Sequence, residues 1–187
     1  MVPVMDLWLP IVLSAVFVFL VSSVIHMLLP IHKGDYAKLA AEDRVLDELR
    51  AHGIAPGTYA FPCAASMKEM GSPEMLEKRK RGPVGFLTIV PSGAHNMGAN
   101  LAQWFVFSLV VGLFAAYIGG LAAAPGERGR DVLQVTSAVA FAGYALATAC
   151  DSIWKGVPWR VTFKFFFDGL VYALVTGATF AWLWPSA

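Results

Sequence analysis

Four apolar segments dominate the sequence, and each is long enough to cross a lipid bilayer. An α-helix rises about 1.5 Å per residue, so roughly 20 apolar residues span the hydrocarbon core. Because hydrocarbon offers the backbone no hydrogen-bonding partner, such a segment must form a helix. The sequence therefore predicts an all-α membrane protein, a four-transmembrane-helix bundle with helices at residues 7–29, 97–123, 132–154 and 159–184.

The composition supports this fold class and excludes one class of function. The 187 residues are 57% hydrophobic and 14% charged, which is far from an ordinary water-soluble domain. The 14 Lys and Arg almost balance the 13 Asp and Glu, so no excess of positive charge favours nucleic acid. The expected partner is the lipid bilayer. The first apolar segment is too long for the core of a signal peptide, so we expect it to be retained.

Residues 30–96 form a polar loop domain between the first helix, within residues 1–29, and the remaining helices, within residues 97–187. The loop holds nine of the 14 Lys and Arg and eight of the 13 Asp and Glu. The pattern predicts a short amphipathic helix that is capped by Asp35 and ends at Gly53, and a second helix that is capped by Ser72. The apolar run at residues 84–90 is too short to span a bilayer and fits an interfacial segment, a re-entrant piece or a strand.

The distribution of Lys and Arg predicts the orientation of the chain. Lys155, Arg160 and Lys164 add three positive charges on the side of residues 30–96, whereas the opposite side carries only Arg128 and Arg130. The positive-inside bias then places the loop in the cytoplasm and both termini outside, in a multi-pass protein of the plasma (bacterial inner) membrane. A basic run is expected to contact anionic lipid; its residues are Lys78, Arg79, Lys80 and Arg81.

Small residues recur at every fourth position on two of the predicted helices. Such stripes let helix backbones approach closely in lipid, where no hydrophobic force acts between helices. They predict helix-packing faces at Gly112, Ala116 and Gly120 and at Gly169, Ala173, Gly177 and Ala181. These faces favour a non-catalytic structural or accessory protein that forms a homo-oligomer or joins a larger membrane complex.

Asp168 is the main exception to the apolar pattern, because it lies inside the last predicted helix. A carboxylate near the bilayer centre costs about 2.5–3.5 kcal/mol on insertion scales, so it needs a partner or a proton. We expect Asp168 to lean toward Lys164 one turn away and to need a hydroxyl or amide from another helix. The up-down bundle gathers a candidate polar intramembrane cluster of Asp168, Lys164, Tyr172, Thr176, Thr179, His26, Asn100, Gln103, Thr148 and Asp151.

This cluster supports two interpretations. Its members could be hydrogen-bonding contacts between helices, which contribute about 0.6 kcal/mol each and have no further role. Alternatively, a cavity open to the cytoplasm could bind a proton, a cation or a small polar ligand on Asp168, which would make the protein a small transporter or ligand-binding protein.

Metal and enzyme chemistry receive little support from the sequence. The sequence offers only weak candidates for metal ligands, because their spacing matches no specific metal motif. They are His26, His32, Cys63 and His95. The sequence contains no HExxH, GxSxG, P-loop or GxGxxG motif. We therefore expect no metal and no cofactor, and a membrane enzyme is the third alternative, with the least support from the sequence.

Three short motifs mark the ends of the predicted helices. They are KGDY at residues 33–36, Met97-Gly98, and KGVPW at residues 155–159 before a glycine-rich last helix. In these motifs the chain resembles small bacterial four-span membrane proteins, a family without an assigned function. The resemblance implies a four-helix membrane domain and carries over no catalytic residues.

Overall fold

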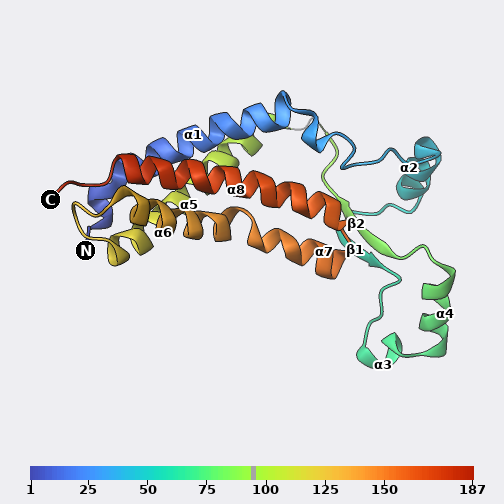
Figure 1. Cartoon of the computed structure of the whole chain (residues 1–187). Helices are drawn as coiled ribbons and strands as arrows, with labels where there is room; N and C mark the ends of the chain where they lie inside the picture. The colour runs from blue at the N-terminus through green and yellow to red at the C-terminus, as the bar shows by residue number, and fades with distance from the viewer. Residues whose placement is uncertain (94–95) are drawn as a thin grey trace. The chain divides into compact units, whose positions relative to one another are not determined.

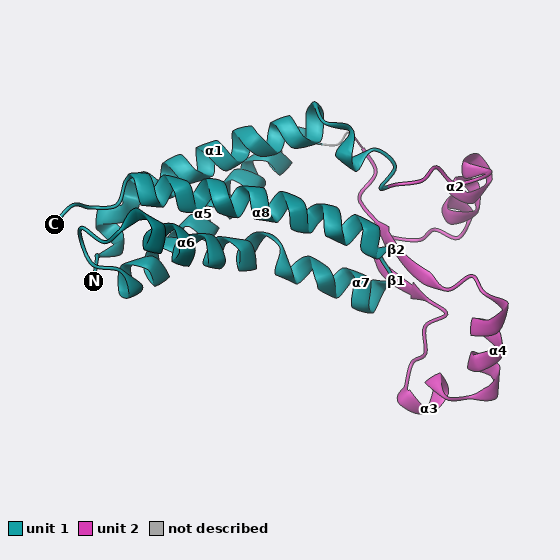
Figure 2. Ribbon diagram, in the orientation of Figure 1, with its two compact units in different colours: residues 1–35, 96–187 teal, residues 36–95 magenta. Residues whose placement is uncertain are grey.

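The chain folds into two compact units in a computed structural model that describes residues 1–93 and 96–187 (Figure 1). Unit 1 comprises Met1–Asp35 and Asn96–Ala187, and unit 2 comprises Tyr36–His95 (Figure 2). Unit 1 contains the long helices, and unit 2 contains the charged segment between the first and second of them. Each unit is described below by itself.

Unit 1 contains the four predicted apolar helices, which run alongside one another (Figure 1). They are α1 (Trp8–Met27), which follows the short 3₁₀ turn η1 (Val4–Leu7), α5 (Met97–Ala122), α6 (Gly129–Tyr144) with its continuation, and α8 (Trp159–Trp182). Together with their flanking turns, all four are long and apolar enough to cross a membrane. The prediction of a mostly helical chain with four such helices is confirmed.

The outer surface of α8 is as apolar as a lipid-facing helix requires. Large apolar side chains are exposed on this helix, among them Phe163, Phe167, Leu170 and Leu174. Exposed apolar surface of this extent suits hydrocarbon rather than water.

Both stripes of small residues pack inside unit 1. Gly112 of α5 lies against α1, where a methyl group on it would approach the carbonyl oxygen of Ile11 to 3.3 Å. Gly169 of α8 lies against Ala145, where a methyl group would approach the Ala145 Cβ to 2.6 Å. The other members follow the same pattern: Ala116 and Ala173 are fully buried, Gly120 packs on Val2, Gly177 packs on Leu133 and Ser137, and Ala181 borders a core cluster.

The third spanning segment differs from the predicted continuous helix at residues 132–154. The α-helix α6 ends at Tyr144, a 3₁₀ turn η3 (Leu146–Thr148) follows, and α7 (Ala149–Lys155) completes the segment. At the break, the Thr148 hydroxyl donates a hydrogen bond to the carbonyl of Ala145, 2.7 Å away. A 3₁₀ stretch inside a helix changes its direction and often marks a functional region. Composition did not reveal this break because the segment contains no proline.

The two chain termini lie at the same end of unit 1 (Figure 1). Leu7, Val132 and Phe180 are fully buried there in one hydrophobic cluster. The Trp184 indole N–H donates to the carbonyl of Ala124 at 2.9 Å and closes the same end. The polar residues that concern function therefore lie toward the other end, where α1 finishes.

Unit 2 combines helices with a hairpin. Strand β1 (Gly57–Phe61) pairs antiparallel with β2 (Gly85–Ile89), with Gly57 opposite Ile89. Of the three alternatives for residues 84–90, the strand is therefore right. The remaining helices are α2 (Glu42–Ala51), α3 (Met67–Met70) and α4 (Pro73–Arg81); Ser72 caps α4 as predicted by accepting a hydrogen bond from the Met75 N–H.

The predicted role of Asp35 as a helix cap is wrong. The helix α2 begins seven residues later, at Glu42, after Ala41, which adopts the left-handed conformation and makes no side-chain cap. The carboxylate of Asp35 is instead used within unit 1, as described below. Its contacts involve residues far along the chain, which a local capping pattern does not register.

We predict that Gly169→Ala lowers the free energy of unfolding by about 1–3 kcal/mol, because the new methyl group overpacks the contact with Ala145. Thermal unfolding in detergent measures the effect. Gly98→Ala is the matched control, since a methyl group there meets nothing closer than 3.6 Å. The double variant Gly169→Ala/Ala145→Gly should recover part of the loss; equal stability of the Gly169 and Gly98 variants would contradict the prediction.

Candidate functional site

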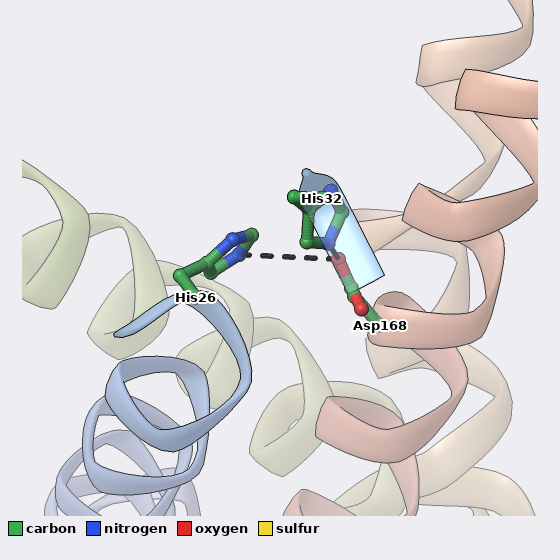
Figure 3. Close-up of side chains that lie close together, drawn as sticks. All are labelled: His26, His32 and Asp168. Carbon is green, nitrogen blue, oxygen red and sulfur yellow. Dashed lines mark hydrogen bonds and ion pairs between the residues drawn. The ribbon is translucent and has the colours of Figure 1, made fainter. Parts of the chain in front are cut away.

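The centre of the candidate site is the buried carboxylate of Asp168 on α8. Its side chain is only 2% exposed. The carboxylate Oδ2 lies 2.8 Å from the Nε2 atom of His32, which belongs to the 3₁₀ turn η2 (Pro30–His32) after α1 (Figure 3). The second carboxylate oxygen, Oδ1, is buried and has no hydrogen-bond partner within residues 1–93 and 96–187. Oδ2 of Asp168 therefore has a hydrogen-bond partner, whereas Oδ1 has none among the described residues.

His32 connects Asp168 to a second carboxylate. Its Nδ1 atom lies 2.7 Å from Oδ2 of Asp35, so a proton must lie in each of its two ring contacts. The turn that permits this pairing uses Gly34, whose φ of +88° is favourable only for glycine. The Asp35 N–H closes the turn by donating to the His32 carbonyl at 3.1 Å. The Lys164 ammonium donates to the other oxygen of Asp35.

His26 completes the arrangement from the last turn of α1. Its Nε2 atom lies 3.9 Å from Asp168 Oδ2 and 3.3 Å from the Tyr172 hydroxyl. Its ring stands beside that of His32, with centroids 4.5 Å apart. Figure 3 shows both histidines directed toward Asp168. We refer to the whole set as the His–carboxylate cluster, defined as His26, His32, Asp35, Lys164, Asp168 and Tyr172.

The cluster combines two carboxylates with one ammonium and two imidazoles. The Lys164 ammonium holds the pKa of the Asp35 carboxyl below its usual value, and the hydrogen bond from His32 acts in the same direction. Asp35 is therefore ionised at neutral pH although its side chain is only 5% exposed. Two carboxylates face one ammonium and the two protons shared through His32, so another cation enters this cluster in exchange for a proton.

A cavity of about 730 Å³ adjoins the cluster. Its walls are mostly apolar and aromatic and include Trp104, Tyr144 and Phe165. The polar part of the wall is supplied by Ser22, Ser23, His26, Asn100, Thr148 and Asp168. A cavity of this size and character is typical of sites that bind small molecules. The irregular turn η3 contributes through Thr148, which agrees with the rule that non-helical backbone at membrane depth borders a cavity or is buried in protein.

The structure brings together part of the predicted polar cluster. Asp168, Lys164, Tyr172 and His26 lie in mutual contact or in the same network, and Asn100 and Thr148 line the cavity. The remaining residues are used elsewhere: Thr176 and Thr179 donate to the carbonyls of Tyr172 and Val175, Asp151 pairs with Lys155, and Gln103 is exposed. Thr176 and Thr179 therefore donate hydrogen bonds within their own helix.

The predicted pairing of Asp168 with Lys164 is wrong. Lys164 bonds to Asp35, and Asp168 takes an imidazole from the turn after α1 in place of the expected hydroxyl or amide. A lysine that precedes an aspartate by four residues is the weaker orientation for a helical pair. The contact of Lys164 with Asp35, 129 residues away in the sequence, therefore forms in place of a contact with Asp168. Sequence reasoning missed His32 and Asp35 as members of the cluster. Their i, i+3 spacing across Gly34, directly after a spanning helix, was the available signal.

The other predicted sites lie apart from the cluster or outside the described residues. His26 and His32, both weak metal candidates, are the ones that approach each other. Cys63 is exposed in unit 2, and His95 lies outside the described residues. The basic run Lys78–Arg81 forms the exposed last turn of α4 in unit 2. Its contact with anionic lipid stays a prediction.

These features define a protein with four membrane-compatible helices and a buried cluster of histidines and carboxylates beside a cavity. Comparison of the chain with protein families, with curated proteins and with solved structures gives no match. Its function is therefore argued from the site.

We predict that His32→Ala lowers the free energy of unfolding by about 3–5 kcal/mol, because it removes the hydrogen-bond partner of Asp168 and leaves that carboxylate buried. Denaturation of the purified protein in detergent measures the change. The matched control is His52→Ala, since the His52 side chain is 74% exposed and pairs weakly with Glu48. We expect the control to stay within about 0.5 kcal/mol of the parent. Equal losses in the two variants would disprove a stabilising role for His32.

Proposed function

We propose that this chain is an integral membrane protein that binds a small ligand in the cavity beside Asp168. The observation that carries the proposal is the buried carboxylate of Asp168, which is among the residues lining a cavity of about 730 Å³ and whose Oδ1 atom has no hydrogen-bond partner among the described residues. Buried polar atoms are almost always satisfied, so an exception at a cavity points to a group that the ligand supplies. Ionisable residues inside membrane segments are rare and usually functional.

The chemistry of the cavity indicates the class of ligand. The walls around Trp104, Tyr144 and Phe165 suit an apolar body. The carboxylate of Asp168, which has acceptor capacity left at Oδ1, suits a cationic or hydrogen-bond-donating polar group. The ligand is thus a small amphipathic molecule with its polar end at the His–carboxylate cluster, and uptake or transport of that molecule is the activity that such a site serves.

The alternative, a purely structural or accessory protein, was favoured by the stripes of small residues as faces for association with another chain. Both stripes of small residues are occupied by contacts between helices of unit 1, namely Gly112 with Ile11 and Gly169 with Ala145. They do not present a free backbone-contact face for a second chain. Formation of a homo-oligomer or of a larger membrane complex would use other surfaces and stays a prediction.

The proposed setting is the plasma membrane of a bacterium, as a four-helix bundle with residues 30–96 in the cytoplasm and both termini outside. The support comes from the bias of Lys and Arg described above.

This orientation predicts the labelling of Cys63, which is exposed in unit 2. In a Cys150→Ser background, a membrane-impermeant maleimide should label Cys63 only after the inner membrane is permeabilised. A Glu127→Cys variant in a fully cysteine-free background is the control for the opposite side, because Glu127 lies between the second and third spanning helices. The Glu127 variant should react in intact spheroplasts. The reverse pattern would contradict the proposed orientation.

Ligand binding predicts a specific effect of Asp168→Asn. The amide preserves size and can still accept a hydrogen bond from His32, so the fold is retained, but the negative charge is lost. Native mass spectrometry of protein released from nanodiscs should detect a bound small molecule on the parent and not on the variant.

Asp151→Asn is the matched control, because Asp151 is a carboxylate of the preceding spanning segment, on α7, that pairs with Lys155 and is not among the residues lining the cavity. It should carry the same molecule as the parent. A parent protein without bound mass, or equal occupancy in all three proteins, would disprove the proposed function.

A further inference from the structure

Two histidines and one aspartate of the His–carboxylate cluster present a set of possible metal ligands. One ring nitrogen of His26, one of His32 and a carboxylate oxygen of Asp168 all lie within 4.8 Å of one another. They come from three separate parts of the fold, namely the end of α1, the turn η2 and the middle of α8 (Figure 3). The sequence analysis expected no metal because these residues follow no motif in the chain; their proximity is entirely tertiary.

We propose that His26, His32 and Asp168 bind a divalent transition-metal ion of the Zn²⁺ class. The inference rests on the proposed function because it makes Asp168 the centre of the same site. Ligand atoms about 2.0–2.1 Å from a tetrahedral zinc ion are about 3.3 Å from each other. The distances of 2.8 Å from His32 and 3.9 Å from His26 to Asp168 Oδ2 lie on either side of that value. Small side-chain movements therefore suffice.

The surroundings of His32 match those of a metal-bound histidine. Such a histidine usually donates its other ring N–H to a carboxylate, which fixes the tautomer and the direction of the ring. Asp35 occupies this position at 2.7 Å from Nδ1, and the Lys164 ammonium holds Asp35 in turn. Nε2 of His32 is consequently the nitrogen that points to Asp168. Asp35 and Lys164 are positioning residues, because they act through His32.

A second and independent observation points to a cation at this place. Asp168 Oδ1 is buried without a hydrogen-bond partner among the described residues, so this carboxylate has unused ligand capacity. The metal would replace the proton between His32 Nε2 and Asp168 Oδ2 and release that proton to solvent. The carboxylates of Asp168 and Asp35 would offset most of the charge of the ion.

The types of ligand select the class of metal. Two imidazoles and one carboxylate suit Zn²⁺ and neighbouring divalent ions, whereas Ca²⁺ and Mg²⁺ require more oxygen ligands. No thiolate is part of the triad, which argues against Cu(I). Three protein ligands leave a coordination position open for water or for a polar group of a molecule in the adjoining cavity.

The test uses the full chain, purified in detergent, stripped with a chelator and titrated with Zn²⁺ or Co²⁺. The parent should bind about one Zn²⁺ per chain, by titration calorimetry and elemental analysis, and Co²⁺ should give the visible ligand-field bands of a site with few ligands. His26→Ala is the decisive variant, because the His26 side chain is 43% exposed and Asp168 keeps its hydrogen bond with His32 when His26 is removed. The Tyr172 hydroxyl loses its 3.3 Å contact with His26. This variant should abolish tight binding and the Co²⁺ bands.

Two further variants separate a metal site from a merely structural cluster. Asp35→Asn keeps all three ligands and should weaken Zn²⁺ binding about 10- to 100-fold and shift the Co²⁺ bands, as loss of an orienting carboxylate does. His52→Ala removes an exposed histidine of unit 2 and should bind Zn²⁺ like the parent.

The outcomes distinguish this inference from the proposed function. Absence of Zn²⁺ and Co²⁺ binding in the parent would overturn the metal site, as would unchanged binding in His26→Ala or equal loss in His52→Ala. If the parent then still carried a small molecule that Asp168→Asn loses, the proposed function would stand without the metal. If Zn²⁺ bound as expected but no molecule occupied the cavity, the ligand-binding proposal would fail and the metal site would remain.

Discussion

A buried carboxylate that needs a partner governs the arrangement of unit 1. Asp168 is almost completely enclosed on α8, and an unpaired charge there would cost several kcal/mol. The His32 imidazole meets this need from the turn after α1, and it is held by Asp35, which is held by Lys164 of α8. The polypeptide that leaves the first spanning helix is thus tied back to the last one by a closed series of hydrogen bonds.

Close helix packing makes this polar connection possible. Small residues such as Gly112 and Gly169 bring α1 against α5 and α6 against α8. At the Asp168 end, however, the 3₁₀ turn η3 interrupts the third spanning segment, and a cavity remains between the aromatic side chains of Trp104 and Tyr144 and the cluster. The end of unit 1 that holds the termini contains a buried hydrophobic cluster. The region beside Asp168 contains a cavity that could bind a ligand.

Length and hydrophobicity were enough to predict the four helices, because a spanning segment must satisfy its own backbone within one continuous stretch. They also identified Asp168 as the unusual residue, since its cost depends only on its place in an apolar helix. The break at residues 145–148 escaped prediction because no proline marks it, and the contact of Ala145 with Gly169 at this point appears only in the folded chain. The hairpin of β1 and β2 pairs segments about 30 residues apart, which periodicity alone does not connect.

The amino-acid sequence by itself thus determined which segments are apolar helices and that one carboxylate would need compensation. Only the tertiary structure decided which side chain forms the hydrogen bond to this carboxylate. Lys164 is the neighbour in sequence, yet it bonds to Asp35, while His32, 136 residues away from Asp168, becomes the partner. The physical reason is that the hydrogen bonds of a buried polar group are fixed by three-dimensional proximity and burial, and neither quantity is encoded in local spacing.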